Sequence, residues 1–242
     1  MDIEVFMEII LVTGANRGIG LALTKVLLAN RNTVIAACRR PQEASELMQL
    51  TLLHPETIDV AKFAVDREEE VVEAAAALRK RHQKLDVIVN NAGIMPEHGH
   101  ESILRIDLEL LRQAFDTNAL GAARVIRAFY PMLAKSERPR IINVSSGLSS
   151  VSTKDNNRYY AYSISKVALN MLTRMMAHEF APSGVTTVAV SPGWVKTDMG
   201  GKEAHLSPEE SAQSLAEAIK RIGPELNGQF LDRDGRIGRY PW

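Results

Sequence analysis

One stretch decides the fold of this chain: Thr13-Gly14-Ala15-Asn16-Arg17-Gly18-Ile19-Gly20. It follows the apolar run Ile9-Ile10-Leu11-Val12 and leads into an apolar segment with helical spacing, residues 21–28. Glycine lets backbone N–H groups approach a phosphate closely, and the start of a helix carries partial positive charge. A strand, a glycine-rich turn and a helix in this order therefore predict a site for the pyrophosphate of a dinucleotide. The alternative is a plain turn before a glycine-rich helix start.

The same order of strand and helix continues along the chain. Apolar runs typical of strands occupy residues 9–12, 33–37, 61–65, 85–89, 140–144, 185–190 and 229–231. Segments with helical spacing lie between them, at 18–30, 41–53, 67–83, 107–135, 158–181 and 207–221. Because the apolar runs do not alternate with polar residues, we expect a parallel sheet covered by helices on both faces, in a doubly wound α/β fold. No linker is visible, so we expect one domain over residues 1–242, with 1–6 as a frayed extension.

Composition and charge exclude several classes of function. The chain has 242 residues with 29 Lys+Arg and 29 Asp+Glu, so the formal net charge is zero. This balance gives no reason to expect nucleic acid or a membrane surface as a partner. One cysteine excludes an intrachain disulfide and a cysteine-based metal cage. No apolar run approaches the roughly 18 residues of a membrane helix, and the acidic first residues do not resemble a secretory signal, so we expect a cytoplasmic protein.

One polar segment contains residue types that bind metals, Glu97-His98-Gly99-His100-Glu101. It lacks a clear third ligand at a fixed spacing. We interpret it as a mobile polar loop and expect no metal site.

Charge at the end of the second strand predicts which nicotinamide cofactor fits. A dehydrogenase that prefers NAD usually places a carboxylate about 20 residues beyond the glycines, where it binds the ribose 2′-hydroxyl. This chain has Arg39 and Arg40 there, and the next acid is Glu43. A guanidinium group favours the 2′-phosphate of NADP, so we predict NADP(H), held by Arg39 with Arg17 as a second candidate. The alternative is that Arg39 and Arg40 are solvated surface charges.

Of the five tyrosines, Tyr162 alone has a lysine four residues later, Lys166. In a helix over 158–181 these two residues share one face. A nearby ammonium group stabilises a phenolate, so we expect Lys166 to lower the pKa of Tyr162 from its ordinary value of about 10. Tyr162 could then act as a general acid toward a carbonyl oxygen. The alternative is a surface pair without function.

Two further polar sites accompany this pair. Ser145 and Ser146 follow the strand at 140–144, where a hydroxyl could hydrogen-bond a substrate carbonyl. The alternative for the serines is an ordinary Ser-Ser-Gly turn. Asn118 lies in the middle of a helix by its pattern, where an amide is unfavourable without a partner. For Asn118 the choice is between a relay or structural role near Lys166 and a locally capped kink.

Together these residues resemble the short-chain dehydrogenase/reductase family, in its single-domain branch, along nearly the whole chain. The motifs that carry the resemblance are Thr13-Gly14-x-x-x-Gly18-x-Gly20, Asn90-Asn91-Ala92-Gly93, Asn118, Ser146, Tyr162-x-x-x-Lys166 and Ser191-Pro192-Gly193. The stretches 16–21 and 192–199 are similar to those of C-factor-like carbonyl reductases. The resemblance implies a Rossmann-type fold with a seven-stranded, mostly parallel sheet in the order 3-2-1-4-5-6-7.

The resemblance also implies roles for single residues. It makes Tyr162 the acid/base, Ser146 the group that orients the carbonyl, Lys166 the partner of the ribose hydroxyls, and Asn118 the support of a proton relay. The implied cofactor contacts are Gly14, Asn16, Arg17, Gly18, Ile19, Gly20, Arg39, Asp66, Asn90, Ala92, Gly93, Tyr162, Lys166, Pro192, Gly193, Val195 and Thr197.

The function that these features favour is NADPH-dependent reduction of a ketone or aldehyde to an alcohol, which is reversible. The alternative is a regulatory or signalling protein that binds NADP(H) on the same fold. We expect a small-molecule substrate and no nucleic-acid or membrane partner. The helix at 158–181 has an apolar face that fits a homo-oligomer, as a dimer or tetramer. The polar segment 149–158 is longer than in many relatives, and we expect it to border the substrate cleft.

Overall fold

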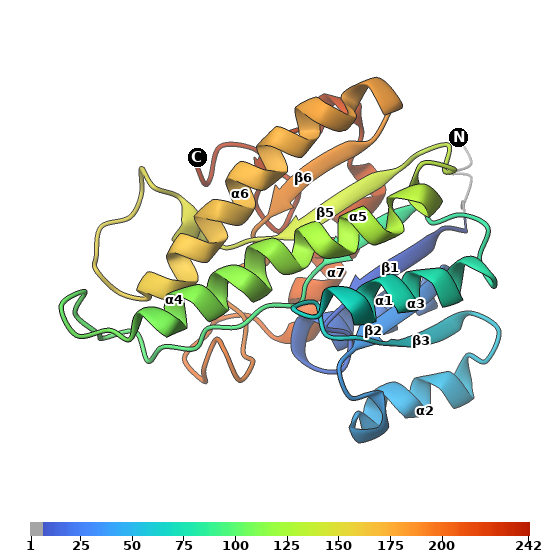
Figure 1. The fold of residues 1–242 in the computed structure, drawn as a ribbon, viewed down its shortest axis with the longest axis horizontal. Helices are drawn as coiled ribbons and strands as arrows, with labels where there is room; N and C mark the ends of the chain where they lie inside the picture. The colour runs from blue at the N-terminus through green and yellow to red at the C-terminus, as the bar shows by residue number, and fades with distance from the viewer. Residues whose placement is uncertain (1–6) are drawn as a thin grey trace.

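A seven-stranded parallel sheet runs through the computed structural model, which describes residues 7–242 (Figure 1). The strands are β1 (Ile9–Thr13), β2 (Thr33–Cys38), β3 (Ile58–Lys62), β4 (Val87–Asn90), β5 (Arg140–Val144), β6 (Thr186–Val190) and β7 (Phe230–Leu231). Their order is β3-β2-β1-β4-β5-β6-β7, which confirms the implied order. The winding reverses between β1 and β4, and ligands of such sheets bind beyond the carboxyl ends of the strands at that point. The interpretation of residues 1–6 lies outside the described residues.

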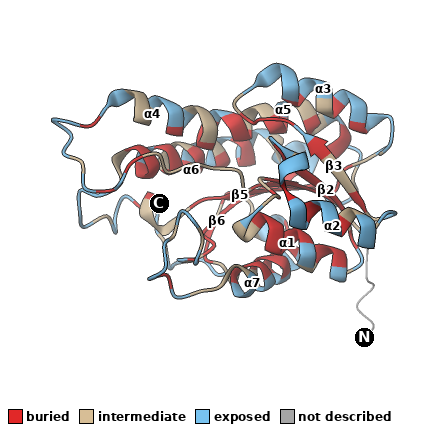
Figure 2. Ribbon diagram, turned by 90° about the horizontal axis from the view of Figure 1, so that it is seen from below, coloured by how far each residue is buried: buried red, intermediate tan, exposed pale blue. Residues whose placement is uncertain are grey.

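Helices cover both faces of the sheet, as expected. Figure 2 shows one layer of α1 (Gly18–Ala29), α2 (Ser45–Leu53) and α7 (Pro208–Arg221). The other layer holds α3 (Glu68–Arg79), α4 (Leu108–Phe115), α5 (Gly121–Leu133) and α6 (Tyr160–Phe180). Along β1, Ile10 and Val12 belong to the core under α1 and α7, while Leu11 belongs to the core under α3 and α5. Within residues 7–242, no helix is long and apolar enough to cross a membrane.

The prediction of the third strand was wrong by three residues. The strand is Ile58–Lys62, where Ile58 pairs with Val34 and Lys62 with Cys38, and not 61–65. It is the edge strand of the sheet, so part of its surface faces solvent and its sequence is partly polar. The apolar run that predicted a strand at 61–65 includes Phe63 and Val65, which are buried but follow the strand.

The helix predicted over 107–135 is two helices joined by a π-helical turn, Asp116–Leu120. Asp107 caps the first helix, because its carboxylate accepts the Glu109 N–H at 2.9 Å. Asn118 and Ala119 are buried within the turn. Such single turns locally change the direction of a helix and are frequent at functional sites.

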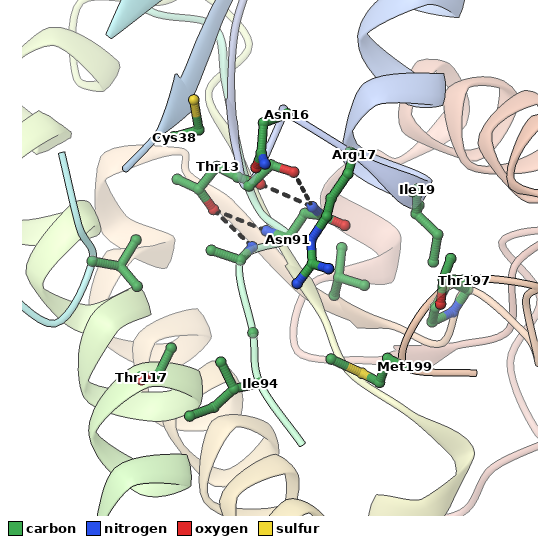
Figure 3. A pocket seen from close by; sticks show the side chains of 18 of the residues that line it. Thr13, Asn16, Arg17, Ile19, Cys38, Asn91, Ile94, Thr117, Thr197 and Met199 are labelled. Atoms are coloured by element: carbon green, nitrogen blue, oxygen red, sulfur yellow. Dashed lines mark hydrogen bonds between the residues drawn. The ribbon is translucent and has the colours of Figure 1, made fainter. Parts of the chain in front are cut away.

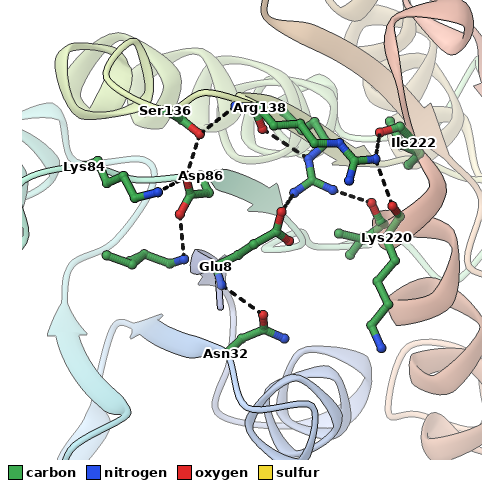
Figure 4. Close-up of polar contacts among 11 residues, drawn as sticks. Glu8, Asn32, Lys84, Asp86, Ser136, Arg138, Lys220 and Ile222 are labelled. Carbon is green, nitrogen blue, oxygen red and sulfur yellow. Dashed lines mark hydrogen bonds and ion pairs between the residues drawn. The ribbon is translucent and has the colours of Figure 1, made fainter. Parts of the chain in front are cut away.

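At the amino ends of the inner strands, a buried arginine at the start of β5, Arg140, ties several chain segments together. Figure 4 shows the polar cluster around Glu8 and Asp86 at this place. The Arg140 side chain is 1% exposed, donates to the Ile219 carbonyl at 2.6 Å and pairs with Glu8. Beside it, Asp86 accepts the Ile9 N–H at 2.9 Å and pairs with Lys84 at 3.0 Å. A buried charge is tolerated when its partners are in place, and the loss of one partner leaves the other uncompensated.

Arg140→Met is expected to destabilise the protein by about 3–5 kcal/mol, because Glu8 and the Ile219 carbonyl lose their partner. For a chain of this size the loss corresponds to a decrease in Tm of about 6–20 °C, measured by thermal unfolding. Arg112→Met is the control, since Arg112 forms an exposed pair with Glu109, and the loss of such a pair changes stability little. Equal Tm values for the two variants would contradict the role of Arg140.

Candidate functional site

A cleft of about 400 Å³ opens at the carboxyl edge of the sheet, beside the point where the winding reverses (Figure 3). Its size is typical of a small-molecule or cofactor site. Segments that follow the first six strands contribute to it. The lining residues that the sequence predicted are Gly14, Asn16, Arg17, Gly18, Ile19, Gly20, Arg39, Asp66, Ala92, Gly93, Tyr162, Lys166, Pro192 and Thr197.

The glycine turn leaves space that a side chain would fill. Gly14 has a φ of +68°, and a Cβ atom there would lie 3.0 Å from Ala92 Cα. A Cβ atom at Gly20 would lie 2.2 Å from the Gly14 carbonyl oxygen. Asn91 holds the turn open, since its side-chain amide donates to the Thr13 carbonyl at 2.9 Å. The first turn of α1 contains no acidic residue, so the open turn and the helix start fit a pyrophosphate group.

Three arginines lie near the predicted 2′-phosphate position, and their partners differ. Arg39 lines the cleft and pairs with no acid among the described residues. Arg40 is paired with Glu43 at 3.1 Å. Arg17 also lines the cleft, but its guanidinium group pairs with Asp198. Arg39 is therefore the guanidinium group that remains free for an anionic ligand, whereas Arg17, the second candidate, already has a carboxylate partner.

Three of the implied cofactor contacts do not line the cleft: Asn90, Gly193 and Val195. The Asn90 amide donates to Asn143 Oδ1 at 2.8 Å, which holds β4 to β5. Gly193 has a φ of +84° and lies against Leu206, and Val195 is buried and bridges to the same leucine. These contacts of the three residues are made within the protein and not with the cleft.

Tyr162 and Lys166 lie together at the start of α6, and both are buried. The Lys166 ammonium nitrogen is 5.8 Å from the centroid of the Tyr162 ring and donates to the Val144 carbonyl at 2.7 Å. The two side chains therefore share one face of the helix, beside the carboxyl end of β5. The spacing of four residues predicted this arrangement.

The expected lowering of the Tyr162 pKa is wrong for the protein by itself. Burial raises the pKa of Tyr162 to about 12, since the phenolate is poorly solvated; hydrogen bonding with Ser146 lowers it, and the charge of Glu97 raises it. Burial also lowers the pKa of Lys166 to about 8, because the ammonium group is removed from water. Removal from water is the largest cause of both shifts. It keeps Tyr162 a neutral phenol, which can donate a proton.

The serine doublet divides into two roles. The Ser145 hydroxyl donates to Asn170 Oδ1 at 2.6 Å and lies 3.1 Å from the Ser149 hydroxyl. The Ser146 hydroxyl accepts the Leu148 N–H at 3.2 Å. Hydrogen bonding between Ser146 and the Tyr162 phenol lowers the pKa of the phenol, against the larger effect of burial. Ser146, the second member, is thus the hydroxyl next to Tyr162.

Asn118 joins three elements through its amide. Its Oδ1 atom accepts the Ile94 N–H, and its Nδ2 atom donates to the Ile94 carbonyl and to the Ser165 hydroxyl, each at 2.8 Å. These bonds connect the π-helical turn, the segment after β4 and helix α6. The amide of Asn118 therefore has partners within the protein, and its role in a proton relay stays a prediction.

Sequence reasoning missed several residues that line or build the cleft. The missed lining residues include Thr13, Cys38, Phe63, Asn91, Ile94, Thr117, Lys196, Asp198 and Met199. Thr13 and Asn91 stand inside the quoted motifs, and their position beside the glycines was the signal. Segment 149–158 does not line the cleft. Arg158 contacts Gly99 and His100, and Ser150 donates to the Pro241 carbonyl.

Known proteins are similar to this chain over most of its length. A model of the short chain dehydrogenase family matches residues 8–206. Two solved structures are similar over 98% of this chain. The NADPH-bound carbonyl reductase from chicken fatty liver has a TM-score of 0.90 with 33% identity over 99% of its own chain. The carbonyl reductase Sniffer of Drosophila melanogaster has a TM-score of 0.92 with 32% identity over its whole chain.

One relative has a name from another class of function. The C-signal protein of Myxococcus xanthus is 37% identical over 159 residues, which cover 65% of this chain and 93% of that protein. The similarity therefore includes both enzymes and a protein named for signalling.

Lys166→Met is expected to raise the stability of the protein by about 1–3 kcal/mol at pH 7, because it removes a buried ammonium group. The pKa of Lys166 is about 8 in the folded protein, below its ordinary value of 10.5. Between these values the unfolded chain binds more protons than the folded one, so the wild type gains stability as pH rises. The difference in stability between Lys166→Met and the wild type therefore becomes smaller at higher pH. Thermal unfolding across pH 7–10.5 measures this, with exposed Lys80→Met as control. A difference that does not change with pH would contradict burial of the charge.

Proposed function

The chain belongs to the short-chain dehydrogenase family, and on that premise we propose that it is an NADP(H)-dependent oxidoreductase that reduces a ketone or aldehyde to an alcohol, reversibly. The observation that carries this proposal is the buried pair of Tyr162 and Lys166 at the edge of a cleft with an open glycine turn. The similarity to two carbonyl reductases, one of them NADPH-bound, supports the carbonyl as the reacting group.

We assign the parts of the cofactor to residues that line the cleft. Backbone N–H groups of the turn from Gly14 to Gly20 would hold the pyrophosphate, with the start of α1. Arg39 would hold the 2′-phosphate, and Asp66 would contact the adenine. Lys166 would bind the nicotinamide ribose, with Pro192 and Thr197 on the nicotinamide side. When bound, NADPH supplies the hydride that the reduction needs.

The residues of the chain supply the proton and the orientation. Tyr162 donates its phenolic proton to the carbonyl oxygen, which becomes the hydroxyl of the alcohol. Ser146 donates a hydrogen bond to the same oxygen and fixes its direction toward the phenol. Asn118 keeps the segment behind Lys166 in place and supports the return of a proton to Tyr162. In the reverse direction Tyr162 accepts the alcohol proton.

A regulatory or signalling protein that binds NADP(H) is the second candidate, and the similarity to C-signal favours it. The two candidates differ in turnover. A panel of ketones and aldehydes with NADPH, and with NADH for comparison, separates them. Oxidation of NADPH with at least one carbonyl compound supports the enzyme, and cofactor binding without turnover supports the regulatory protein.

Tyr162→Phe is expected to lower kcat by about 10²–10⁴-fold, because it removes the proton donor while the ring stays in place. NADPH binding, measured by the change in cofactor fluorescence, is expected to stay close to that of the wild type. Tyr160→Phe, two residues earlier in the same helix, is the control and should retain its turnover. Retained turnover in Tyr162→Phe would remove Tyr162 as the acid.

Arg39→Gln is expected to weaken NADPH binding by about 10–100-fold, since a charge-assisted bond to the phosphate is lost. NADH carries no 2′-phosphate, so its affinity should change little. Arg40→Gln is the matched control, because Arg40 is adjacent but already paired with Glu43. If Arg39→Gln bound NADPH as tightly as the wild type, the assignment of the 2′-phosphate would be wrong.

A further inference from the structure

Two segments that are far apart in the sequence, residues 158–159 and 99–100, are in contact just before helix α6. Arg158 lies just before the helix; it donates to the Gly99 carbonyl at 3.4 Å and lies 3.0 Å from His100 Nε2. Tyr159 has a φ of +60°, and its ring occupies the space of a Cβ atom at Gly99, only 2.1 Å away. Glycine at position 99 is therefore required for the contact.

The loop after β4 is also held from within. The Glu101 carboxylate accepts the N–H groups of His98, Gly99 and His100 at 2.7, 2.8 and 2.9 Å. Together with Arg158 and Tyr159, these bonds fix the backbone that carries Glu97. The segment that was interpreted as a mobile polar loop is thus tied down at several points.

Glu97 is buried below the first turn of α6, with 4% of its surface exposed. Its Oε1 atom accepts the Tyr162 N–H at 2.7 Å. Its Oε2 atom is buried and has no hydrogen-bond partner among the described residues. Tyr159, at the start of the helix, contributes no capping bond from its side chain. The cap of this helix therefore comes from a carboxylate 65 residues earlier in the chain.

A buried acid with an unpaired oxygen costs free energy, so its presence at this place calls for an explanation. We propose that Glu97 is a positioning residue for Tyr162: its carboxylate fixes the helical turn that carries the tyrosine, and it places a buried negative charge at the backbone of that residue. The proposal rests on the proposed role of Tyr162 as acid/base.

The charged groups around the phenol come from two elements. Lys166 stands on α6 itself, and Glu97 stands on the loop after β4, while the neutral Ser146 lies at the end of β5. Lys154, from the segment before the helix, is directed to the Arg158 carbonyl and the Ser163 hydroxyl, at 2.8 and 3.4 Å. The charge of Glu97 raises the pKa of Tyr162, in the same direction as burial.

The consequence concerns the direction of the reaction. Reduction of a carbonyl needs the protonated phenol, and oxidation of an alcohol needs the phenolate. A carboxylate beside the phenol disfavours the phenolate. Glu97 therefore keeps Tyr162 in the form that reduction uses and extends reduction to higher pH.

Glu97→Gln tests this, because glutamine keeps an oxygen that can accept the Tyr162 N–H but has no charge. The pH at which the reductive kcat falls is expected to decrease by about 0.5–1.5 pH units. The pH at which the oxidative kcat rises should decrease by the same amount. Glu73→Gln is the control, since it removes one negative charge from an exposed position of α3 and leaves the loop that carries Glu97 intact. A lower kcat with an unchanged pH profile would overturn the proposal and leave Glu97 a purely structural cap.

Two further measurements keep the test independent of turnover and of folding. Carbon NMR of protein labelled in its tyrosine rings follows ionisation of Tyr162 without substrate, with Tyr162→Phe to assign the signal. The Tyr162 signal should begin to shift at lower pH in Glu97→Gln than in the wild type, and an equal onset would overturn the proposal even if no carbonyl substrate is found. If Glu97→Gln does not fold, Glu97→Asp replaces it, because aspartate keeps the charge on a shorter side chain. The kcat of Glu97→Asp should fall without a shift of its pH profile. A shifted pH profile in this variant would overturn the proposal.

Discussion

Burial of an ammonium group costs free energy, and in this protein the ammonium group of Lys166 is buried beside the phenol of Tyr162. Lys166 is held by the Val144 carbonyl at the end of β5, and Tyr162 lies one turn earlier on the same helix. Burial shifts the pKa of each group from its value in water: Lys166 gives up its proton more readily, and Tyr162 less readily. The fold holds this pair at the edge of the cleft, and the proposed chemistry depends on it.

The surrounding structure fixes the pair from three sides. Asn118 ties the π-helical turn to the segment after β4 and to α6. Glu97 caps the turn that carries Tyr162. The Ser145 hydroxyl is used inside the protein, which leaves Ser146 next to the phenol. At the amino ends of the strands, away from the cleft, Arg140 joins Glu8, which precedes the first strand, to the last helix within a polar cluster (Figure 4).

Local features could be predicted from the sequence, and tertiary features could not. The glycine turn, the sheet order and the spacing of Tyr162 and Lys166 follow from patterns within a few residues or from family resemblance. The edge strand was predicted at the wrong residues, because an edge strand such as Ile58–Lys62 is only partly buried and its sequence lacks a continuous apolar run. The predicted direction of the Tyr162 pKa shift was wrong because the burial of Tyr162 depends on segments that lie far away in the sequence. The pairing of Arg17 with Asp198 and the cap by Glu97 join residues 181 and 65 positions apart, and no local pattern marks them.

The most direct test of the central claim follows the transferred hydrogen. Wild-type protein is mixed with a carbonyl compound and NADPH that carries deuterium at its transferable position, and the alcohol product is analysed by mass spectrometry and NMR. The account predicts deuterium on the carbinol carbon and a hydroxyl hydrogen that comes from the protein and solvent. Bound cofactor with no deuterium in any product, across ketones and aldehydes, would contradict it.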